Sequence, residues 1–207
     1  MEAFQERGAM DIPLIRIDLA QVGTTKRNCM KVVPSERENG MPKILERVVV
    51  GGVNGSMVCL FRKKGDTQVA YKTPPTGKPI ESIILGGAVG SVCDKVFVAS
   101  DNAVRGVSKK GKHFFAFETN MAEPIRRLFI LGVDMVCCGR RTYTHYHDCA
   151  EVHHVVLPED IMDVVSLQSE GGTLVGRPFT TVLACGDNTI KVFGHRVIDR
   201  RVFRAAF

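Results

Sequence analysis

Apolar residues recur along the chain in short runs, and each run ends at Gly, Pro, Asn or Asp. The clearest series predicts four strands, at 80–85, 95–100, 103–108 and 113–119. Short runs rich in Val, Ile and Phe between turn residues are typical of antiparallel strands. A helical period is nowhere sustained, so the pattern predicts an all-β protein.

The chain also repeats itself with a period of about 45 residues. Residues 58–73 align without a gap with residues 104–119 at an offset of 46, and six of the sixteen aligned positions are identical. Residues 79–87 align with residues 124–132 at an offset of 45. A period of about 40 to 45 residues made of short strands is typical of propeller blades, each of which is a four-stranded sheet.

Four such units are predicted, at about 44–73, 80–119, 125–157 and 161–193. Apolar runs before residue 44 are candidates for an outer strand of a closing blade. Three units place a turn pair between their second and third strands, at Asn54-Gly55, Asp101-Asn102 and Asp187-Asn188, and these residue types tolerate the positive φ of tight hairpins. The third unit has Arg140-Arg141 at that place, so its turn geometry is left open. We expect an N-terminal tail over 1–13, a partial propeller over 14–193 and a divergent basic tail over 194–207.

Composition narrows the class of protein. The 207 residues are 44% hydrophobic and 24% charged, which excludes collagen-like, low-complexity and disordered chains. Lys and Arg number 28 against 22 Asp and Glu, a formal net charge of +6, and the excess is diffuse, with short clusters such as those at 62–64 and 109–112. Short clusters beside Gly favour solvated turns. Binding of nucleic acid or an anionic membrane surface is the alternative, through these turns and the tail residues Arg196, Arg200, Arg201 and Arg204.

Cysteine usage and the N-terminus bear on the compartment. The seven Cys are scattered, mostly inside apolar runs, which favours a reducing environment. The first ten residues lack the basic start and apolar core of a secretory signal, and no apolar run reaches the roughly 18 residues of a membrane span. We therefore expect a soluble cytosolic protein.

The sequence offers one cluster of candidate metal ligands, comprising His145, His147, Cys149, His153 and His154. Imidazole and thiolate groups bind zinc. Alternation along a strand, however, would put His145, His147 and Cys149 on one face at steps of roughly 7 Å, which suits a row of side chains better than a tetrahedron. We favour hydrogen-bonding histidines in a hairpin, with titration near neutral pH as a functional alternative.

No other motif indicates catalysis. The glycines lack the spacing of phosphate-binding loops, and the acidic residues Glu159, Asp160 and Asp163 are not favoured as a catalytic dyad. The aromatic residues Phe115 and Phe117 would share a strand face and are predicted to pack between adjacent blades instead of stacking on bases. We predict no enzyme activity, no catalytic residues and no cofactor or metal.

A family resemblance covers residues 15–193. It rests on six segments in a fixed order, namely LAQVG from Leu19, CMKVVPS from Cys29, GSMVCLFRKKG from Gly55, SKKGKHFFAFETN from Ser108, HYHDC from His145 and VLACGDNTIKVF from Val182. In this order they resemble the amino-terminal β-propeller of the Bardet-Biedl syndrome seven family, whose members are subunits of the BBSome coat complex. After residue 193 the sequence departs from the family.

The resemblance implies a non-enzymatic scaffold in ciliary membrane-protein trafficking and cilium assembly, working with intraflagellar transport. The implied partners are other BBSome propeller subunits, with ciliary cargo and an Arf-like small GTPase reached indirectly, peripheral membrane association through the coat, and no nucleic acid. The implied locations are the cytoplasm, the basal body or centrosome, the cilium and its membrane. The family ring has about seven blades, which need roughly 315 residues. We therefore expect a WD40-like propeller with about four of seven blades and an open edge.

Overall fold

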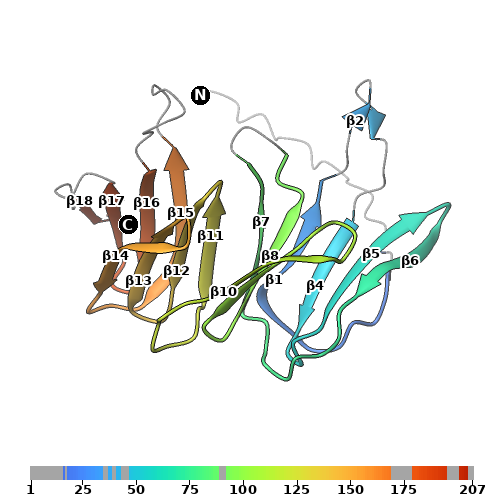
Figure 1. Cartoon of the computed structure of the whole chain (residues 1–207), viewed down its shortest axis with the longest axis horizontal. Helices are drawn as coiled ribbons and strands as arrows, with labels where there is room; N and C mark the ends of the chain where they lie inside the picture. The colour runs from blue at the N-terminus through green and yellow to red at the C-terminus, as the bar shows by residue number, and fades with distance from the viewer. Residues whose placement is uncertain are drawn as a thin grey trace, which may run out of the picture.

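The computed structural model describes residues 16, 18–34, 37–38, 41–42, 47–88, 92–168, 179–194 and 201–204. Every regular element in these ranges is a β-strand. The strands form four antiparallel sheets of four strands each and one two-stranded ribbon (Figure 1). The predicted all-β propeller with four four-stranded blades is confirmed.

Within each blade the strands pair in chain order. Blade 1 contains β1 (Thr25–Val33), β4 (Arg47–Gly52), β5 (Met57–Lys63) and β6 (Asp66–Lys72). Blade 2 contains β7 (Ser82–Gly86), β8 (Lys95–Ser100), β9 (Ala103–Val107) and β10 (His113–Glu118). Blade 3 contains β11 (Arg127–Leu131), β12 (Asp134–Cys138), β13 (Thr142–His147) and β14 (Ala150–Val156). Blade 4 contains β15 (Ile161–Gln168), β16 (Phe179–Cys185), β17 (Thr189–Gly194) and β18 (Arg201–Arg204), and the ribbon is β2 (Arg37–Glu38) with β3 (Met41–Pro42).

The four strands predicted for blade 2 are confirmed to within two residues at each end. The prediction for the segment before residue 44 is wrong, because β1 is the first strand of blade 1 and not an outer strand of a closing blade. It pairs with β4 and contacts β7 of the next blade. Cys29 and Val33 explain this place, since both are almost fully buried in the apolar layer between blades 1 and 2.

The fourth blade takes its outer strand from the segment that the sequence assigned to a C-terminal tail. β18 pairs with β17 over residues 189–192 and 201–204. The N-terminal residues 1–13, and Arg196 and Arg200 of the tail, lie outside the described residues.

The gapless repeat alignment is correct in the outer strand and one residue out of register in the third strand. Tyr71 of β6 pairs with Cys59, whereas the equivalent Phe117 of β10 pairs with Val104. Cys59, and not Val58, therefore takes the place of Val104. The shift arises because the turns between the third and fourth strands differ in length. In blade 1, Lys63 pairs with Asp66 across a two-residue turn, whereas in blade 2, Val107 pairs with His113 across the five residues 108–112.

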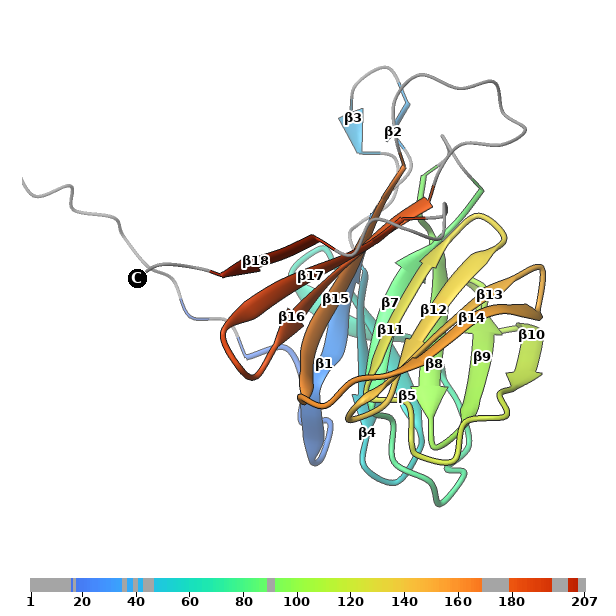
Figure 2. The same ribbon diagram turned by 90° about the vertical axis from the view of Figure 1, so that its left-hand side faces the viewer.

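The core consists of three apolar layers, one between each pair of consecutive blades. The innermost strands β1, β7, β11 and β15 follow one another along the long axis of the molecule (Figure 1), overlap when it is turned by 90° (Figure 2), and contact in succession. The predicted packing of Phe115 and Phe117 between blades is confirmed, because both pack against the apolar layer between blades 2 and 3, and the Phe117 ring lies 5.1 Å from that of Tyr146 of blade 3. The first layer joins Val49 and Cys59 of blade 1 to Ile83 and Val96 of blade 2. The second joins Ala99 and Val104 of blade 2 to Leu128 and Cys137 of blade 3. The third joins Val136 and Cys138 of blade 3 to Ile161 and Leu183 of blade 4.

Candidate interaction surfaces

On one side of the blade stack, each connection between blades binds the hairpin turns of both blades that it joins. In the connection from blade 1 to blade 2, the Gly77 N–H donates to the Asn54 carbonyl (3.0 Å) in the turn of blade 1. The next residue, Lys78, forms an ion pair with Asp101 (2.8 Å) in the turn of blade 2. Asp101 has a φ of 57°, as predicted for a tight turn at this place. These bonds fix the position of one blade relative to the next.

Glu123 makes the corresponding link between blades 2 and 3. Its Oε1 accepts from the N–H groups of Thr142 (2.9 Å) and Arg141 (3.2 Å), and its Oε2 accepts from the N–H of Arg140 (2.8 Å). Burial alone would raise the pKa of Glu123, but the Thr142 side chain and the three backbone N–H groups outweigh it and hold the pKa below its usual value. The carboxylate takes over the role that the Asn54 and Asp187 side chains play in the turns of blades 1 and 4, which resolves the geometry of the Arg140-Arg141 turn.

The same turn reaches forward to blade 4. Arg140 Nε lies 2.8 Å from Asp160 Oδ2 and Arg141 Nε lies 3.1 Å from Asp160 Oδ1. These hydrogen bonds lower the pKa of Asp160. Glu159, the neighbouring acidic residue, pairs instead with Lys191. Of the two carboxylates that the sequence considered as a dyad, Asp160 is thus engaged by two arginines and Glu159 by one lysine.

The histidine cluster is organised by an acidic residue that the sequence reasoning did not include. His145 Nε2 lies 2.9 Å and His147 Nδ1 lies 2.8 Å from Oδ1 of Asp134. A carboxylate only accepts, so each of these ring nitrogens carries the proton of its bond. His145 is buried and His147 is exposed. Asp134 could have been found, because the hairpin register that pairs Cys138 with Tyr143 also pairs Asp134 with His147.

The other members of the cluster point to different neighbours. The His153 ring stacks 6.1 Å from that of His145, while His154 Nδ1 lies 3.0 Å from the Thr144 hydroxyl. Cys149 does not continue the strand face that was predicted for His145 and His147. It lies in the turn after β13, where Asp148 has a φ of 48° and Cys149 a φ of 63°. Among the described residues, no group of three or more His, Cys, Asp or Glu side chains is placed to hold a metal ion.

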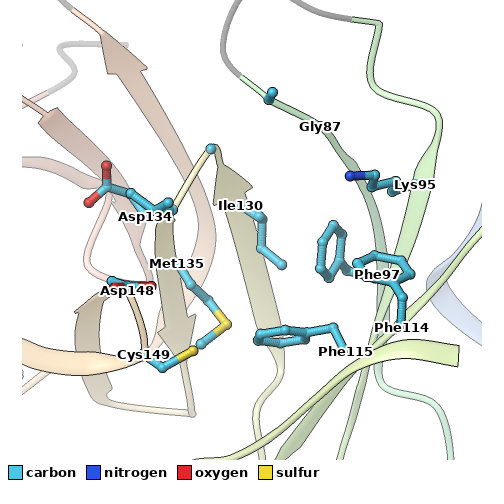
Figure 3. A pocket seen from close by; sticks show the side chains of 13 residues that line it. Gly87, Lys95, Phe97, Phe114, Phe115, Ile130, Asp134, Met135, Asp148 and Cys149 are labelled. Atoms are coloured by element: carbon cyan, nitrogen blue, oxygen red, sulfur yellow. The ribbon is translucent and has the colours of Figure 1, made fainter. Parts of the chain in front are cut away.

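A cavity of about 480 Å³ lies between blades 2 and 3, on the side opposite the connections. Phe97, Phe114 and Phe115 line it from blade 2, and Met135 and Cys149 line it from blade 3 (Figure 3). Its lining is mostly apolar but also includes the charged residues Lys95, Asp134 and Asp148, so it suits a mainly apolar group. No sequence signal marks the cavity, because its two walls come from different repeats.

Five of the seven cysteines are buried, and Cys93 and Cys149 are exposed. All seven are free thiols. Burial raises the pKa of the Cys137 and Cys138 thiols far above the ordinary range, and it raises that of Cys149 as well. These thiols are therefore protonated at neutral pH.

The two terminal blades each leave one face without a neighbouring blade in the described chain. On blade 1, Met30, Val32 and Val69 are 64%, 52% and 60% exposed. On blade 4, Val165 and Ile190 are 44% and 40% exposed. In the described ranges, extended contacts join β1 to β7, β7 to β11 and β11 to β15, but no comparable contact joins β15 to β1. The predicted open edge is confirmed as a pair of apolar faces.

The basic turns are engaged partly within the chain. Lys109 Nζ lies 3.5 Å from Asp94, and the Lys109 carbonyl accepts from the Arg47 guanidinium. Lys95 Nζ lies 5.4 Å from the centre of the Phe114 ring.

In the ranges described, we find no helix with the length and hydropathy needed to cross a bilayer.

Comparison with known proteins gives a family and two close relatives. The family model described as BBS7 beta-propeller matches residues 30–202. The Caenorhabditis elegans protein named BBSome complex member bbs-7 is 49% identical over 178 residues, which cover 86% of this chain and 24% of that protein. The mouse BBSome complex member BBS7 is 37% identical over 183 residues, covering 88% and 24%. The chain thus spans about a quarter of the length of these relatives.

Among solved structures, BBS1N in complex with ARL6DN superposes with a TM-score of 0.59 at 16% identity. The superposition covers 86% of this chain and 54% of that chain. This likeness shows the fold alone.

Proposed function

Because the chain belongs to the BBS7 beta-propeller family, we propose that it is a non-enzymatic propeller module that helps to assemble a BBSome coat. The single observation that carries this proposal is the family match, which spans all four blades. Its mechanism is the presentation of rigid blade faces and turns to other subunits, a use for which propellers are suited.

The geometry supports this role in two respects. The connections fix the angle between blades through bonds such as those of Glu123 and Asp160. The open apolar faces and the cavity beside Met135 offer surfaces of the kind that protein interfaces bury. Fixed geometry lowers the entropy that a scaffold loses on binding.

The partners follow from the same family. We propose that this chain binds other BBSome propeller subunits directly, and that cargo membrane proteins and an Arf-like small GTPase reach it through the complex. The BBS1N structure was solved with ARL6DN, which supports a small GTPase as a component of such assemblies. The chain then acts in ciliary membrane-protein trafficking, at the basal body and cilium, as a peripheral component of the membrane.

Affinity purification of the tagged chain from ciliated cells tests the proposal. We expect other BBSome subunits to co-purify and to remain bound at moderate salt. A matched variant with Lys109, Lys110 and Lys112 changed to Gln should retain them equally, because the proposal does not use the basic turns. Absence of BBSome subunits would contradict the proposal, and steeply salt-dependent nucleic-acid binding lost in the Gln variant would favour the alternative function.

A further inference from the structure

The cavity between blades 2 and 3 owes its aromatic wall to a β-bulge in β10. Phe114 is an extra residue on this strand, because His113 pairs with Val107 while Phe115 already pairs with the next residue of β9, Gly106. A bulge redirects side chains that would otherwise alternate between the two faces of a sheet. Phe114 and Phe115 therefore both line the cavity, although they are consecutive in the chain.

Gly106 leaves room for the redirected Phe114 ring. A Cβ at Gly106 would lie 2.7 Å from Phe114 Cζ, so a larger residue there would displace the ring. The Phe114 and Phe115 rings each meet the Phe97 ring edge to face, with 5.5 Å and 5.8 Å between the ring centres. Phe114 nevertheless remains 47% exposed. The three rings thus form an ordered aromatic wall that is open to solvent at Phe114.

The opposite wall comes from blade 3 and carries sulfur. The Met135 thioether and the Phe115 ring project toward each other across the cavity, and Cys149 lies beside Met135 (Figure 3). Sulfur makes favourable contacts with aromatic rings. Val133 of this wall is 57% exposed, so both sides of the cavity mouth present a large apolar side chain to solvent. Such side chains around a concave site indicate that it binds an apolar group.

The charged residues of the lining stand on opposite walls. Lys95 belongs to β8 of blade 2, and its ammonium lies over the Phe114 ring. Asp148 lies in the turn after β13 of blade 3, is exposed and forms no ion pair in the described part of the chain. Asp134, the other acidic residue of the lining, binds two histidines through its Oδ1. The mouth is therefore basic on the blade 2 side and acidic on the blade 3 side.

Size and charge together favour one class of occupant. The volume of about 480 Å³ lies within the range of about 300 to 1,000 Å³ that ligand sites have. A complementary occupant has an aromatic centre, an acidic group on one side and a basic group on the other. A short polypeptide segment has this chemistry, and aromatic side chains in apolar pockets dominate the energetics of protein interfaces. A fatty acyl chain lacks both charges, and nucleic acid lacks the basic group.

We propose that this cavity binds a short segment of a protein partner. An aromatic side chain of the segment enters between Phe115 and Met135, an acidic residue beside it pairs with Lys95, and a basic residue pairs with Asp148. The inference rests on the proposed function for the choice of a protein as the occupant. Its test uses synthetic peptides, so its failure would leave co-purification with BBSome subunits, which tests the proposed function, unaffected.

Binding of blocked tripeptides to the purified full chain tests the proposal. The chain contains no Trp, so the fluorescence of a Trp in the peptide reports its own burial. The probes are acetyl-Asp-Trp-Lys-amide and the neutral acetyl-Ser-Trp-Ser-amide. We expect a saturable blue shift with a dissociation constant of about 0.1 to 1 mM for the charged peptide. The neutral peptide should bind about two- to fivefold more weakly, because exposed ion pairs contribute little.

Variants of the cavity separate the aromatic contact from the charges. Phe114→Ala should weaken the binding of both peptides at least about fivefold, because it removes one aromatic wall. Asp148→Asn and Lys95→Gln should each reduce the preference for the charged peptide and leave the neutral peptide bound as before. The matched controls are Val69→Ala and Asp66→Asn, which change an exposed valine and an exposed aspartate of the outer hairpin in blade 1 and should change neither affinity.

Thermal melting of each variant reports folding, and Val133→Ser replaces Phe114→Ala if that variant does not fold. Absence of saturable binding up to about 5 mM peptide would overturn the proposal. So would binding that the cavity variants leave unchanged, or equal affinity of the wild-type chain for the two peptides. Dihexanoylphosphatidylcholine is the competing probe, because it combines both charges with apolar chains. If it displaces the charged peptide with a lower dissociation constant than the peptide itself has, the occupant is a lipid and the proposal of a protein segment is wrong.

Discussion

Replacement of Glu123 by Gln tests whether the connections hold the blades at fixed angles. Glu123 accepts three backbone N–H groups at 2.8 to 3.2 Å from the turn of blade 3. Gln keeps the size of the side chain but exchanges one accepting oxygen for an NH₂ group, which would face an N–H donor. The variant therefore loses the charge and at least one of the three bonds while leaving the apolar layers intact.

The expected cost follows from the exposure of the site. Hydrogen bonds to a charged group contribute about 1.5 to 3 kcal/mol each when they are buried. Glu123 is partly exposed, so water replaces part of the lost interaction, and we expect a total destabilisation of about 1 to 2 kcal/mol. For a chain of this length, that corresponds to a melting temperature lower by about 2 to 8 °C.

The pH dependence supplies a second, independent readout. The pKa of Glu123 is lower in the folded chain than its usual value of 4.5 in an unfolded one. Its stabilisation is therefore fully present above pH 4.5 and is lost as the pH falls through the lower, folded pKa. Glu123→Gln should remove this part of the acid sensitivity, so wild type and variant should converge in stability as the pH falls.

Thermal melting and urea unfolding between neutral pH and about pH 3 measure both effects. The control is Glu118→Gln, which changes an exposed glutamate on β10 in blade 2 and should leave stability unchanged within about 0.5 kcal/mol. If Glu123→Gln melts with wild type at neutral pH, or if the difference persists at low pH, then Glu123 does not hold the turn through its charge.

Four further predictions concern packing, charge, thiols and edges. Gly51→Val should destabilise blade 1 by about 1 to 3 kcal/mol in urea unfolding, because a Cβ there would lie 2.8 Å from Ile80 Cγ2. Asp160→Asn should lower the melting temperature at neutral pH and make it less sensitive to acid, because the pKa of Asp160 is depressed and its contribution is lost as the pH falls. Maleimide should modify Cys93 and Cys149 in the native chain and all seven thiols after unfolding, as counted by mass spectrometry, with Cys149 reacting faster as the pH rises. In hydrogen exchange at low concentration, β8 and β12 should be protected longer than β1 and β16, and equal protection would contradict the weaker packing of the terminal blades.

The sequence predicts the blades well because each blade is a local hairpin pattern. The run 95–100 gives β8 without error, since its turn residues and apolar alternation lie within a few positions of one another. Features that join distant repeats are harder to predict. β1 belongs to a blade that resumes after an insertion, and the cavity between Phe97 and Met135 is formed only when two blades meet. Asp134 is intermediate, because its contact with His147 follows from hairpin register but requires the turn to be placed correctly first.

A repeat fold of this kind links stability to assembly. Each blade is a thin sheet that can bury both faces only between two neighbours, so the middle blades complete their cores within the chain and the terminal blades do not. The apolar side chains of Met30 and Val165 gain their burial only from another polypeptide segment. Whatever binds those faces therefore stabilises the terminal blades by the free energy of that binding, and the amount depends on its concentration. A partner subunit, a further blade and a second copy would all stabilise the chain in this way, but only the second copy makes its melting temperature rise with its own concentration.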